Sequence, residues 1–304
     1  MSAGPPAEID IDSSLVRGLV AGQCPDLATS PLRFVANGWD NTLVRAGEHA
    51  LLRLPRRSVA AELLRNEATW LPRIAADLPI PVPVPIHLGH STGDYPFPWT
   101  VVPWFEGEVL SATALEHPGR VATALGSFVG ALHVDAPADA PHNPYRGVPL
   151  VQRDAVTRSR LLGAHGLLQA ARIDPDEVRQ AWDDALGAEP HQGPAHWVHG
   201  DLHPHNIVAR HGEIVAVIDF GDITAGDPAT DLLAAWYLFE QAERDAFRSA
   251  VGIAGGSIDD AQWARGKGWG IIHALAVIDG ETPGSPLAQL AIGALARMIG
   301  SSGD

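Results

Sequence analysis

Short apolar runs separated by turn residues characterise the first third of the chain. Four of these runs lie before residue 104: 34–35, 43–44, 50–54 and 99–103. Turns rich in glycine and asparagine separate the first three, a pattern typical of β-strands joined as hairpins. A short helix is expected before them, over Ser13–Ala21. The pattern therefore predicts a small antiparallel sheet in this part of the chain.

A helix is predicted after Ser58, which we expect to be its N-cap. Apolar residues at helical spacing form its inward stripe: Ala60, Leu63, Leu64 and Leu71. Glu67 falls within that stripe, and a buried carboxylate destabilises a fold unless it is paired. Glu67 therefore either has a cationic partner or remains partly exposed. The helix should break or kink near Pro72.

The rest of the chain is expected to be mainly helical. Alternating prolines make Leu78–Pro85 an extended connector, and we place a lobe boundary after Trp104, which divides the chain into residues 1–104 and 105–304. A strand–turn–strand block covers residues 196–219. The helices are expected at about 111–134, 150–187, 229–250, 258–279 and 285–299.

Charge is distributed unevenly between these two parts. The chain has 21 basic and 36 acidic residues, a net charge of −15. Residues 1–104 hold 8 basic and 10 acidic residues, and residues 105–304 hold 13 and 26, so the balances are −2 and −13. An acidic surface repels phosphate backbones, which argues against a nucleic-acid partner. A cationic ligand would be favoured, although acidity can also serve solubility alone.

Targeting signals and disulfides are not indicated by the sequence. The N-terminus lacks a basic start followed by an apolar stretch, and no apolar run reaches the roughly 18 residues of a membrane-spanning helix. The single cysteine, Cys24, cannot form an internal disulfide and is consistent with a reducing compartment. We expect a cytoplasmic protein without a membrane partner, as a monomer or weak dimer.

The candidate chemistry lies in the strand–turn–strand block. A strand at His196–Val198 leads into a polar loop, and two further strands end at Asp219. The resulting hairpin should bring Asp201, Asn206 and Asp219 to one end of a small sheet. One carboxylate can meet an attacking hydroxyl, and the other two oxygen ligands suit a hard cation. This arrangement is typical of phosphoryl transfer.

Three motifs carry a family resemblance: HGDLHPHN at 199–206, VIDFGD at 217–222 and GDPATDL at 226–232. Together they resemble the core of the aminoglycoside and macrolide phosphotransferases. The resemblance implies an α+β, bilobal, protein-kinase-like fold with a small antiparallel-sheet N-lobe and a larger, mainly helical C-lobe. It also implies ATP and Mg²⁺, with Asp201 as catalytic base, Asn206 and Asp219 as metal ligands, and Asp231 as a brace for the catalytic loop.

The resemblance also suggests a nucleotide site. The Pro103 carbonyl and the Phe105 N–H would face the adenine edge, and the turn from Gly38 to Asn41 would stand in place of a phosphate-covering loop. Such enzymes commonly pair a lysine with a helix glutamate at the phosphates. The only lysine here is Lys267, so Arg53 takes that place and Glu67 becomes its expected partner.

The expected function is ATP-dependent phosphorylation of a hydroxylated small molecule, an antibiotic such as an aminoglycoside or macrolide. A sugar or amino-alcohol metabolite is the alternative acceptor. A metal hydrolase using His199, Asp201, His203 and His205, a nucleotide-binding pseudokinase and a protein kinase are less favoured. If the acceptor is cationic, its candidate contacts lie in the C-terminal part: Asp259, Asp260, Trp263, Trp269, Asp279 and Glu281.

Overall fold

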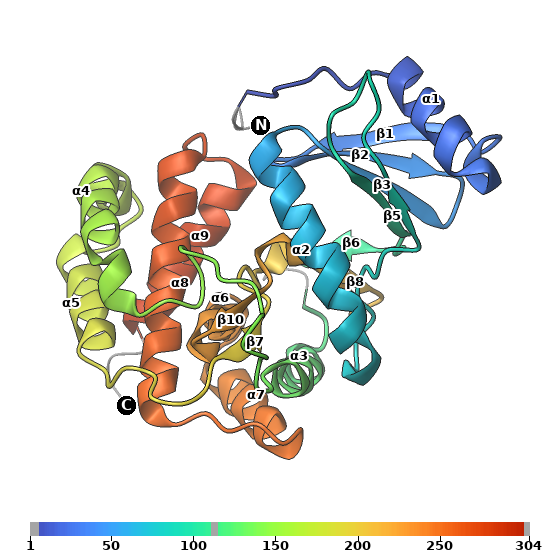
Figure 1. The fold of residues 1–304 in the computed structure, drawn as a ribbon. Coiled ribbons are helices and arrows are strands. Elements are labelled where there is room, and N and C mark those ends of the chain that lie inside the picture. Colours follow the sequence, from blue (N-terminus) through green and yellow to red (C-terminus); the bar gives the residue numbers. More distant parts are fainter. Residues whose placement is uncertain (1–5, 111–114, 301–304) are drawn as a thin grey trace.

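An antiparallel five-stranded sheet forms the N-terminal part of the structure, a computed structural model that describes residues 6–110 and 115–300 (Figure 1). The strand order is β1-β2-β3-β5-β4. The strands are β1 Leu32–Asn37, β2 Asn41–Ala46, β3 Ala50–Pro55, β4 His87–Gly89 and β5 Trp99–Pro103. The antiparallel sheet expected from the short apolar runs is thus confirmed.

Side-chain alternation explains why this sheet has one well-packed face. Successive residues of β2 alternate between buried and half-buried, with Val44 fully buried, as expected for a strand with one face on the core. Helix α1 (Ser13–Gln23) supplies Val16 and Leu19 to the same apolar cluster, together with Leu52 and Trp99 of the sheet. Burial of these side chains anchors α1 to the sheet.

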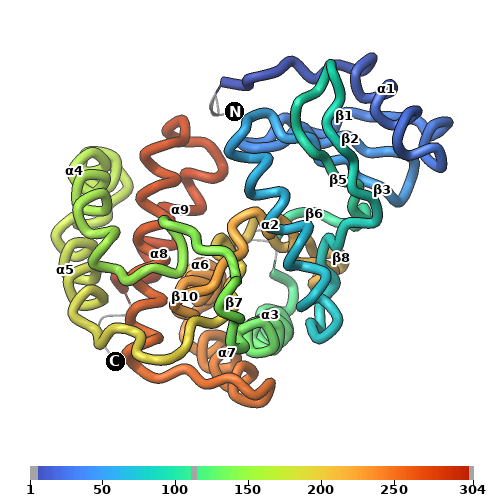
Figure 2. The backbone as a smooth tube through the Cα atoms, in the orientation of Figure 1, coloured from blue at the N-terminus to red at the C-terminus, as the bar shows by residue number. Residues whose placement is uncertain are grey.

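Helix α2 (Ser58–Ile74) lies between the sheet and the helical part of the chain (Figure 2). Its N-cap is Arg57, not Ser58, and the Arg57 side chain makes no capping hydrogen bond. The carboxylate of Glu8 instead accepts hydrogen bonds from the N–H and the hydroxyl of Ser58. The helix continues through Pro72 and ends two residues later, so the break falls later than expected. Its buried face includes Glu67, which is only 2% exposed.

The remainder of the chain is mainly helical, and two of the expected helices are divided. Residues 150–187 form two α-helices because Arg172 takes a left-handed conformation between them, and the segment 229–250 is interrupted at Phe239 and Glu240. The α-helices are α3 Pro118–Leu132, α4 Asp154–Ala170, α5 Pro175–Leu186, α6 Leu233–Leu238, α7 Gln241–Ile253, α8 Asp260–Gly280 and α9 Pro286–Gly300.

Helix α8 is the central helix of this part, packed against α4, α5, α6 and α9 (Figure 1). Most of its residues are buried, among them Trp269, Ile271 and Leu275. A helix surrounded in this way must be apolar on nearly all sides. Within the described ranges, no helix has the length and apolarity needed to cross a bilayer.

Five short strands position the polar motifs at the boundary with the sheet. They are β6 Glu108–Val109, β7 His196–Val198, β8 Ile207–Arg210, β9 Glu213–Val217 and β10 Thr224–Gly226. β8 and β9 form the expected hairpin, with β6 on its outer edge, and β7 pairs with β10. β6 follows Trp104 but pairs with β8 of the C-terminal part and not with the five-stranded sheet. We therefore propose that the smaller lobe ends near Trp104.

A glycine contact between α3 and α7 gives a test of this packing. A Cβ at Gly126 would lie 2.9 Å from the Ala250 Cβ and would also meet the Phe247 carbonyl oxygen. We expect Gly126→Ala to lower the free energy of unfolding by about 1–3 kcal/mol through overpacking. Gly163→Ala on α4, where nothing lies within 4 Å, should instead raise it by about 0.4–1 kcal/mol. Urea unfolding of both variants checks the prediction, and equal effects would contradict the close approach of α3 and α7.

Candidate active site

The loop after β7 is held in shape by one buried carboxylate. Asp231, fully buried, accepts hydrogen bonds from the N–H groups of His199 at 2.8 Å and Gly200 at 2.9 Å, and it contacts His133 Nε2 at 3.1 Å. Gly200 has a φ of +87°, and a Cβ there would lie 2.5 Å from the backbone oxygen of Asp222. Only glycine suits this position. Asp231 therefore braces the loop that presents Asp201, as the sequence motif suggested.

Asn206 and Asp219 come from adjacent segments at one end of the β8–β9 hairpin. The Asn206 carbonyl accepts a hydrogen bond from the Ile218 N–H at 2.8 Å, which fixes Asp219 next to it. Asn206 Nδ2 donates to the Asp201 carbonyl at 2.9 Å, so the amide oxygen faces away from that bond. Asp219 adopts a left-handed conformation, φ 63° and ψ 67°, and its side chain is 58% exposed. These hard oxygen donors fit a magnesium ion.

Arg53 connects this end of the hairpin to α2. Its guanidinium forms an ion pair with Glu67 and donates to Asp219 Oδ1 at 3.1 Å. Burial alone would lower the pKa of Arg53, but the carboxylates of Glu67 and Asp219 outweigh burial and raise it. Burial raises the pKa of Glu67, against the opposing effect of Arg53. The carboxylate expected on the buried face of α2 is thus paired with the arginine inferred to replace lysine.

A cavity of about 310 Å³ lies between the sheet and the hairpin. The proposed nucleotide contacts Gly38, Asn41, Pro103 and Phe105 all line it, with Arg53 and Asp219 also on its wall. The remaining walls are largely apolar and come from both parts of the chain: Leu43, Leu51, Val102, Val208 and Ile218. An apolar cleft ending in a few charged groups is typical of a nucleotide site.

Backbone direction at the end of β5 leaves two polar groups for a ligand. The Trp104 N–H donates to the His49 carbonyl at 2.8 Å. Because peptide groups alternate in direction along an extended chain, the Pro103 carbonyl and the Phe105 N–H face the opposite side. The hinge contacts expected from the sequence would require these two groups to be free on that side, and they stay a prediction.

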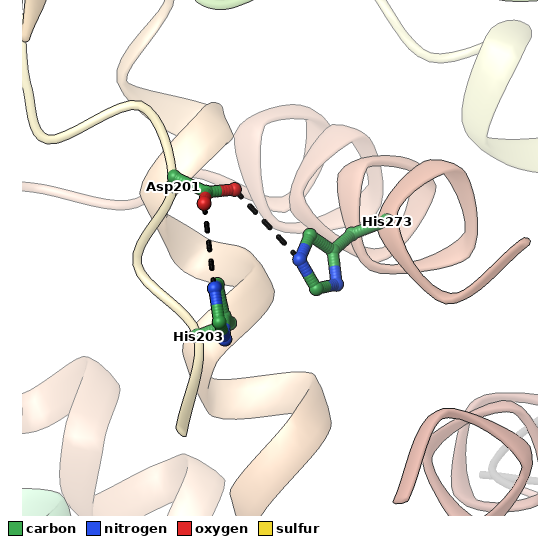
Figure 3. A group of neighbouring side chains, drawn as sticks. All are labelled: Asp201, His203 and His273. Atoms are coloured by element: carbon green, nitrogen blue, oxygen red, sulfur yellow. Dashed lines mark ion pairs between the residues drawn. The ribbon is translucent and has the colours of Figure 1, made fainter. Parts of the chain in front are cut away.

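The carboxylate of Asp201 is surrounded by a guanidinium and two imidazoles, and Figure 3 shows the two imidazoles. Arg146 Nη2 lies 3.0 Å from Oδ1, His203 Nε2 lies 3.3 Å from Oδ2, and His273 Nε2 lies 3.7 Å from Oδ1. Burial favours the protonated acid, but Arg146 and then His203 and His273 hold the pKa of Asp201 well below its ordinary value. Asp201 is therefore ionised at neutral pH.

Arg146 and His273 were not anticipated from the sequence. Arg146 lies in the loop before α4 and also contacts Asp222 Oδ2 at 3.2 Å through Nε. His273 lies on α8, and its Nδ1 is 2.8 Å from the Tyr237 hydroxyl. Burial, followed by the charge of His203, lowers the pKa of His273 to about 3, so its imidazole is neutral. The sequence did offer one signal for His273, which interrupts an apolar run of α8. A buried polar side chain needs a hydrogen-bond partner, so its presence there indicated a polar contact.

The histidine cluster proposed for a metal hydrolase does not form. The His199 ring is used internally, since Nε2 lies 3.0 Å from the Ile218 carbonyl and Nδ1 accepts from the Asp201 N–H at 3.2 Å. His205 contacts the His203 ring but is not among the described residues grouped with Asp201 as potential metal ligands. Of the four residues expected to form this metal site, only Asp201 and His203 lie together as potential ligands.

Four of the six candidate acceptor contacts lie at the far end of α8 or are covered by other side chains. Asp259 is the N-cap of α8 and Asp260 begins it, roughly 20 Å along the helix from His273 at 1.5 Å per residue. Trp269 is 1% exposed within the core, and Trp263 packs against Trp236. Asp279 and Glu281 lie at the other end of α8, where Asp279 forms an ion pair with Arg160 at 3.4 Å. The charge of Glu281 raises the pKa of His205, whereas burial lowers it overall.

Comparison with known proteins places this site in a family. The sequence profile of the phosphotransferase enzyme family matches residues 31–269. No curated protein matches the sequence.

Solved structures share the fold over almost the whole chain. The GDP and kanamycin complex of APH(2")-IIIa is 15% identical with a TM-score of 0.64, covering 94% of this chain and 99% of that one. The macrolide 2'-phosphotransferase MphH from Brachybacterium faecium is 24% identical with a TM-score of 0.62, covering 92% and 97%. The streptomycin–ATP complex of APH(2")-IIa is 14% identical with a TM-score of 0.58, covering 89% and 91%. This likeness establishes a bilobal, kinase-like fold.

The Arg53–Glu67 pair can be tested with a double-mutant cycle. Arg53→Ala leaves a buried carboxylate unpaired, so we expect a loss of about 3–5 kcal/mol in the free energy of unfolding. Arg53→Ala/Glu67→Ala should recover part of that loss, though not the contact between Arg53 and Asp219. Urea unfolding measures both effects. As a matched control, Arg179→Ala removes an exposed ion pair with Asp176 and should change stability by less than about 1 kcal/mol. Additivity of the two substitutions would contradict a coupled pair.

Proposed function

The chain belongs to the phosphotransferase enzyme family and is a small-molecule kinase; we propose that its donor is ATP and its acceptor a hydroxyl group of an aminoglycoside or macrolide antibiotic. The observation that carries this proposal is the convergence of four groups at the hairpin end. Asp201, Asn206 and Asp219 lie together there. Arg53 donates a hydrogen bond to Asp219, and both residues line the cavity.

ATP fits the polarity of the cavity. An adenine edge offers an amino donor and a ring-nitrogen acceptor, which complement the Pro103 carbonyl and the Phe105 N–H. The apolar walls would cover the base, and Arg53 would reach the phosphates at the far end. Arginine presents a planar fork that binds phosphate and carboxylate at once, so Arg53 can keep Glu67 while it contacts the nucleotide.

Asn206 and Asp219 are the proposed magnesium ligands. Asn206 and Asp219 would hold Mg²⁺ through their side-chain oxygens, and the ion would neutralise the negative charge that develops in phosphoryl transfer. The protein holds both ligands in place through backbone hydrogen bonds of the hairpin. Arg53 contacts one oxygen of Asp219 and leaves the other available.

Asp201 is proposed to orient the acceptor hydroxyl and to take its proton. A carboxylate whose pKa is held well below the ordinary value is a weak base, so it gains little by removing a proton early. A largely dissociative transfer needs proton removal only late, when the oxygen has become acidic. Asp201 thus acts mainly by positioning, with Arg146 keeping the carboxylate ionised.

The acceptor is proposed to be an antibiotic, with a sugar or amino-alcohol metabolite as the alternative. Relatives in fold include a kanamycin complex and a macrolide phosphotransferase. The acidic balance of residues 105–304 favours a cation, and Asp279 and Glu281 are the candidate acidic contacts nearest the site. A cytoplasmic location, where ATP and Mg²⁺ are available, and a monomer or weak dimer remain our expectations.

The catalytic assignment is tested by substitution at the hairpin end. We expect Asp201→Asn to lower kcat by about 10²-fold or more, because the hydroxyl loses its oriented acceptor, while ATP binding persists. Asp219→Ala should abolish turnover with loss of the metal. Steady-state kinetics with calorimetric ATP binding separates the two effects. Near-wild-type kcat in Asp201→Asn on a verified acceptor would refute the assignment.

A panel of acceptors tests the function itself. Aminoglycosides, macrolides, amino sugars and amino alcohols are incubated with Mg-ATP and scored for phosphorylated product by mass spectrometry. For a polycationic acceptor, KM should rise several-fold between about 20 and 300 mM salt at constant kcat, because screening weakens its attraction to the acidic lobe. A flat response would indicate a macrolide or a neutral acceptor. No product from any antibiotic would refute the antibiotic assignment in favour of a metabolite.

A further inference from the structure

The side chains around Asp201 form a group of metal-binding atoms distinct from the magnesium ligands. Asp201, His203 and His273 each offer one ligand atom, and these three atoms all lie within 4.8 Å of one another. Figure 3 shows the two imidazoles facing the carboxylate from different elements, one from the loop after β7 and one from α8. We propose that this group is a binding site for a divalent transition metal of the zinc class, and that its occupation inhibits phosphoryl transfer.

The distances are close to those that such a metal requires. Bonds of about 2.0–2.1 Å in a tetrahedral arrangement place neighbouring ligand atoms about 3.3 Å apart. His203 Nε2 lies 3.3 Å from Asp201 Oδ2, His273 Nε2 lies 3.7 Å from the other oxygen, Oδ1, and one ligand atom from each residue lies within 4.8 Å of the other two. Small side-chain movements would therefore complete the coordination. The carboxylate is 24% exposed, which leaves room for water as a further ligand.

His273 is oriented as a ligand by its own surroundings. Its Nδ1 lies 2.8 Å from the hydroxyl of buried Tyr237, and a hydrogen bond at that nitrogen directs Nε2 toward Asp201. Metal-binding histidines are commonly held by a partner on their other nitrogen. Burial within α8 also keeps the imidazole neutral, and only the neutral ring has a lone pair for a metal.

Ligand type separates this site from the proposed magnesium site. Imidazole nitrogen favours zinc-class metals, whereas carboxylate and amide oxygens favour magnesium. Asn206 links the two sites because its Nδ2 also lies 3.2 Å from His203 Nε2. A metal on His203 would release that contact and would occupy the carboxylate needed by the acceptor hydroxyl. The inhibitory effect rests on the proposed role of Asp201, but metal binding does not.

Substitution of Arg146 should change the affinity for the metal in the opposite direction to substitution of the histidines. Its guanidinium lies 3.0 Å from Asp201 Oδ1, so it repels a metal ion that approaches the same carboxylate. Arg146 also contacts Asp222 and can remain there when the metal binds. Removal of this cation should therefore tighten metal binding, whereas removal of either histidine should weaken it.

The binding experiment uses the full chain without nucleotide, because ATP itself binds Zn²⁺. Zn²⁺ affinity is measured by calorimetry, and Co²⁺ serves as a spectroscopic probe of imidazole coordination. We expect His203→Gln and His273→Gln each to weaken Zn²⁺ binding by at least about tenfold, and Arg146→Gln to strengthen it. His165→Gln, an exposed position on α4, is the control for adventitious binding among the 14 histidines and should match wild type.

The outcomes distinguish this site from failure of the proposed function. Circular dichroism confirms that each variant is folded, and His203, which lies on a loop and is partly buried, provides a second test if His273→Gln within the helix α8 does not fold. Wild-type affinity in a folded His203→Gln or His273→Gln variant would overturn the metal site. With a verified acceptor, Zn²⁺ should inhibit wild type but not the histidine variants that retain turnover. Equal inhibition of those variants would overturn the inhibitory role, while binding is measured even if no acceptor is found.

Discussion

One buried guanidinium connects the parts of the structure on which the proposed chemistry depends. Arg53 of β3 contacts Glu67 of α2 and Asp219 at the end of the hairpin. Burying a charge is unfavourable unless its partners are also in place, so sheet, helix and hairpin must adopt one relative position for Arg53 to be satisfied. The same requirement explains the acidic residue on the buried face of α2. Arg53 therefore fixes the relative position of the sheet, α2 and the hairpin as well as contributing to stability.

A second electrostatic constraint acts at Asp201. Arg146 and two imidazoles hold this carboxylate ionised, which weakens it as a base while fixing its direction. Such a group suits a reaction in which the acceptor oxygen loses its proton late. The arrangement also places two nitrogen ligands beside the carboxylate, from which its affinity for a softer metal is inferred. The proposed catalytic positioning and the inferred affinity for metal ions thus have a common structural origin.

The errors of the sequence interpretation have physical causes. Asp259, Asp260, Trp263 and Trp269 were grouped with Asp279 and Glu281 as acceptor contacts because all six lie in the C-terminal part of the chain, beyond the family motifs. A helix as long as α8 separates its two ends by about 30 Å, so nearness in sequence does not imply a shared site. The division between α4 and α5 had a local signal that the sequence interpretation overlooked, because Asp174 caps α5 and Pro175 stands at its start.

The sequence by itself determined the elements whose contacts are local. The strand pattern and the hairpin that joins Asn206 to Asp219 follow from short-range spacing and backbone hydrogen bonds. The brace at Asp231 acts over more than 30 residues and was implied only by the family resemblance. The pairing of Arg53 with Glu67 was also inferable, because the family resemblance implies a cation on that strand, the only lysine lies far from it, and Glu67 falls on an apolar stripe. Only the tertiary structure brought Arg146, Tyr237 and His273 to Asp201. Those contacts depend on how α8 and the loop before α4 pack around the hairpin, and the burial that fixes this packing is non-directional, so no local pattern specifies which distant residues meet.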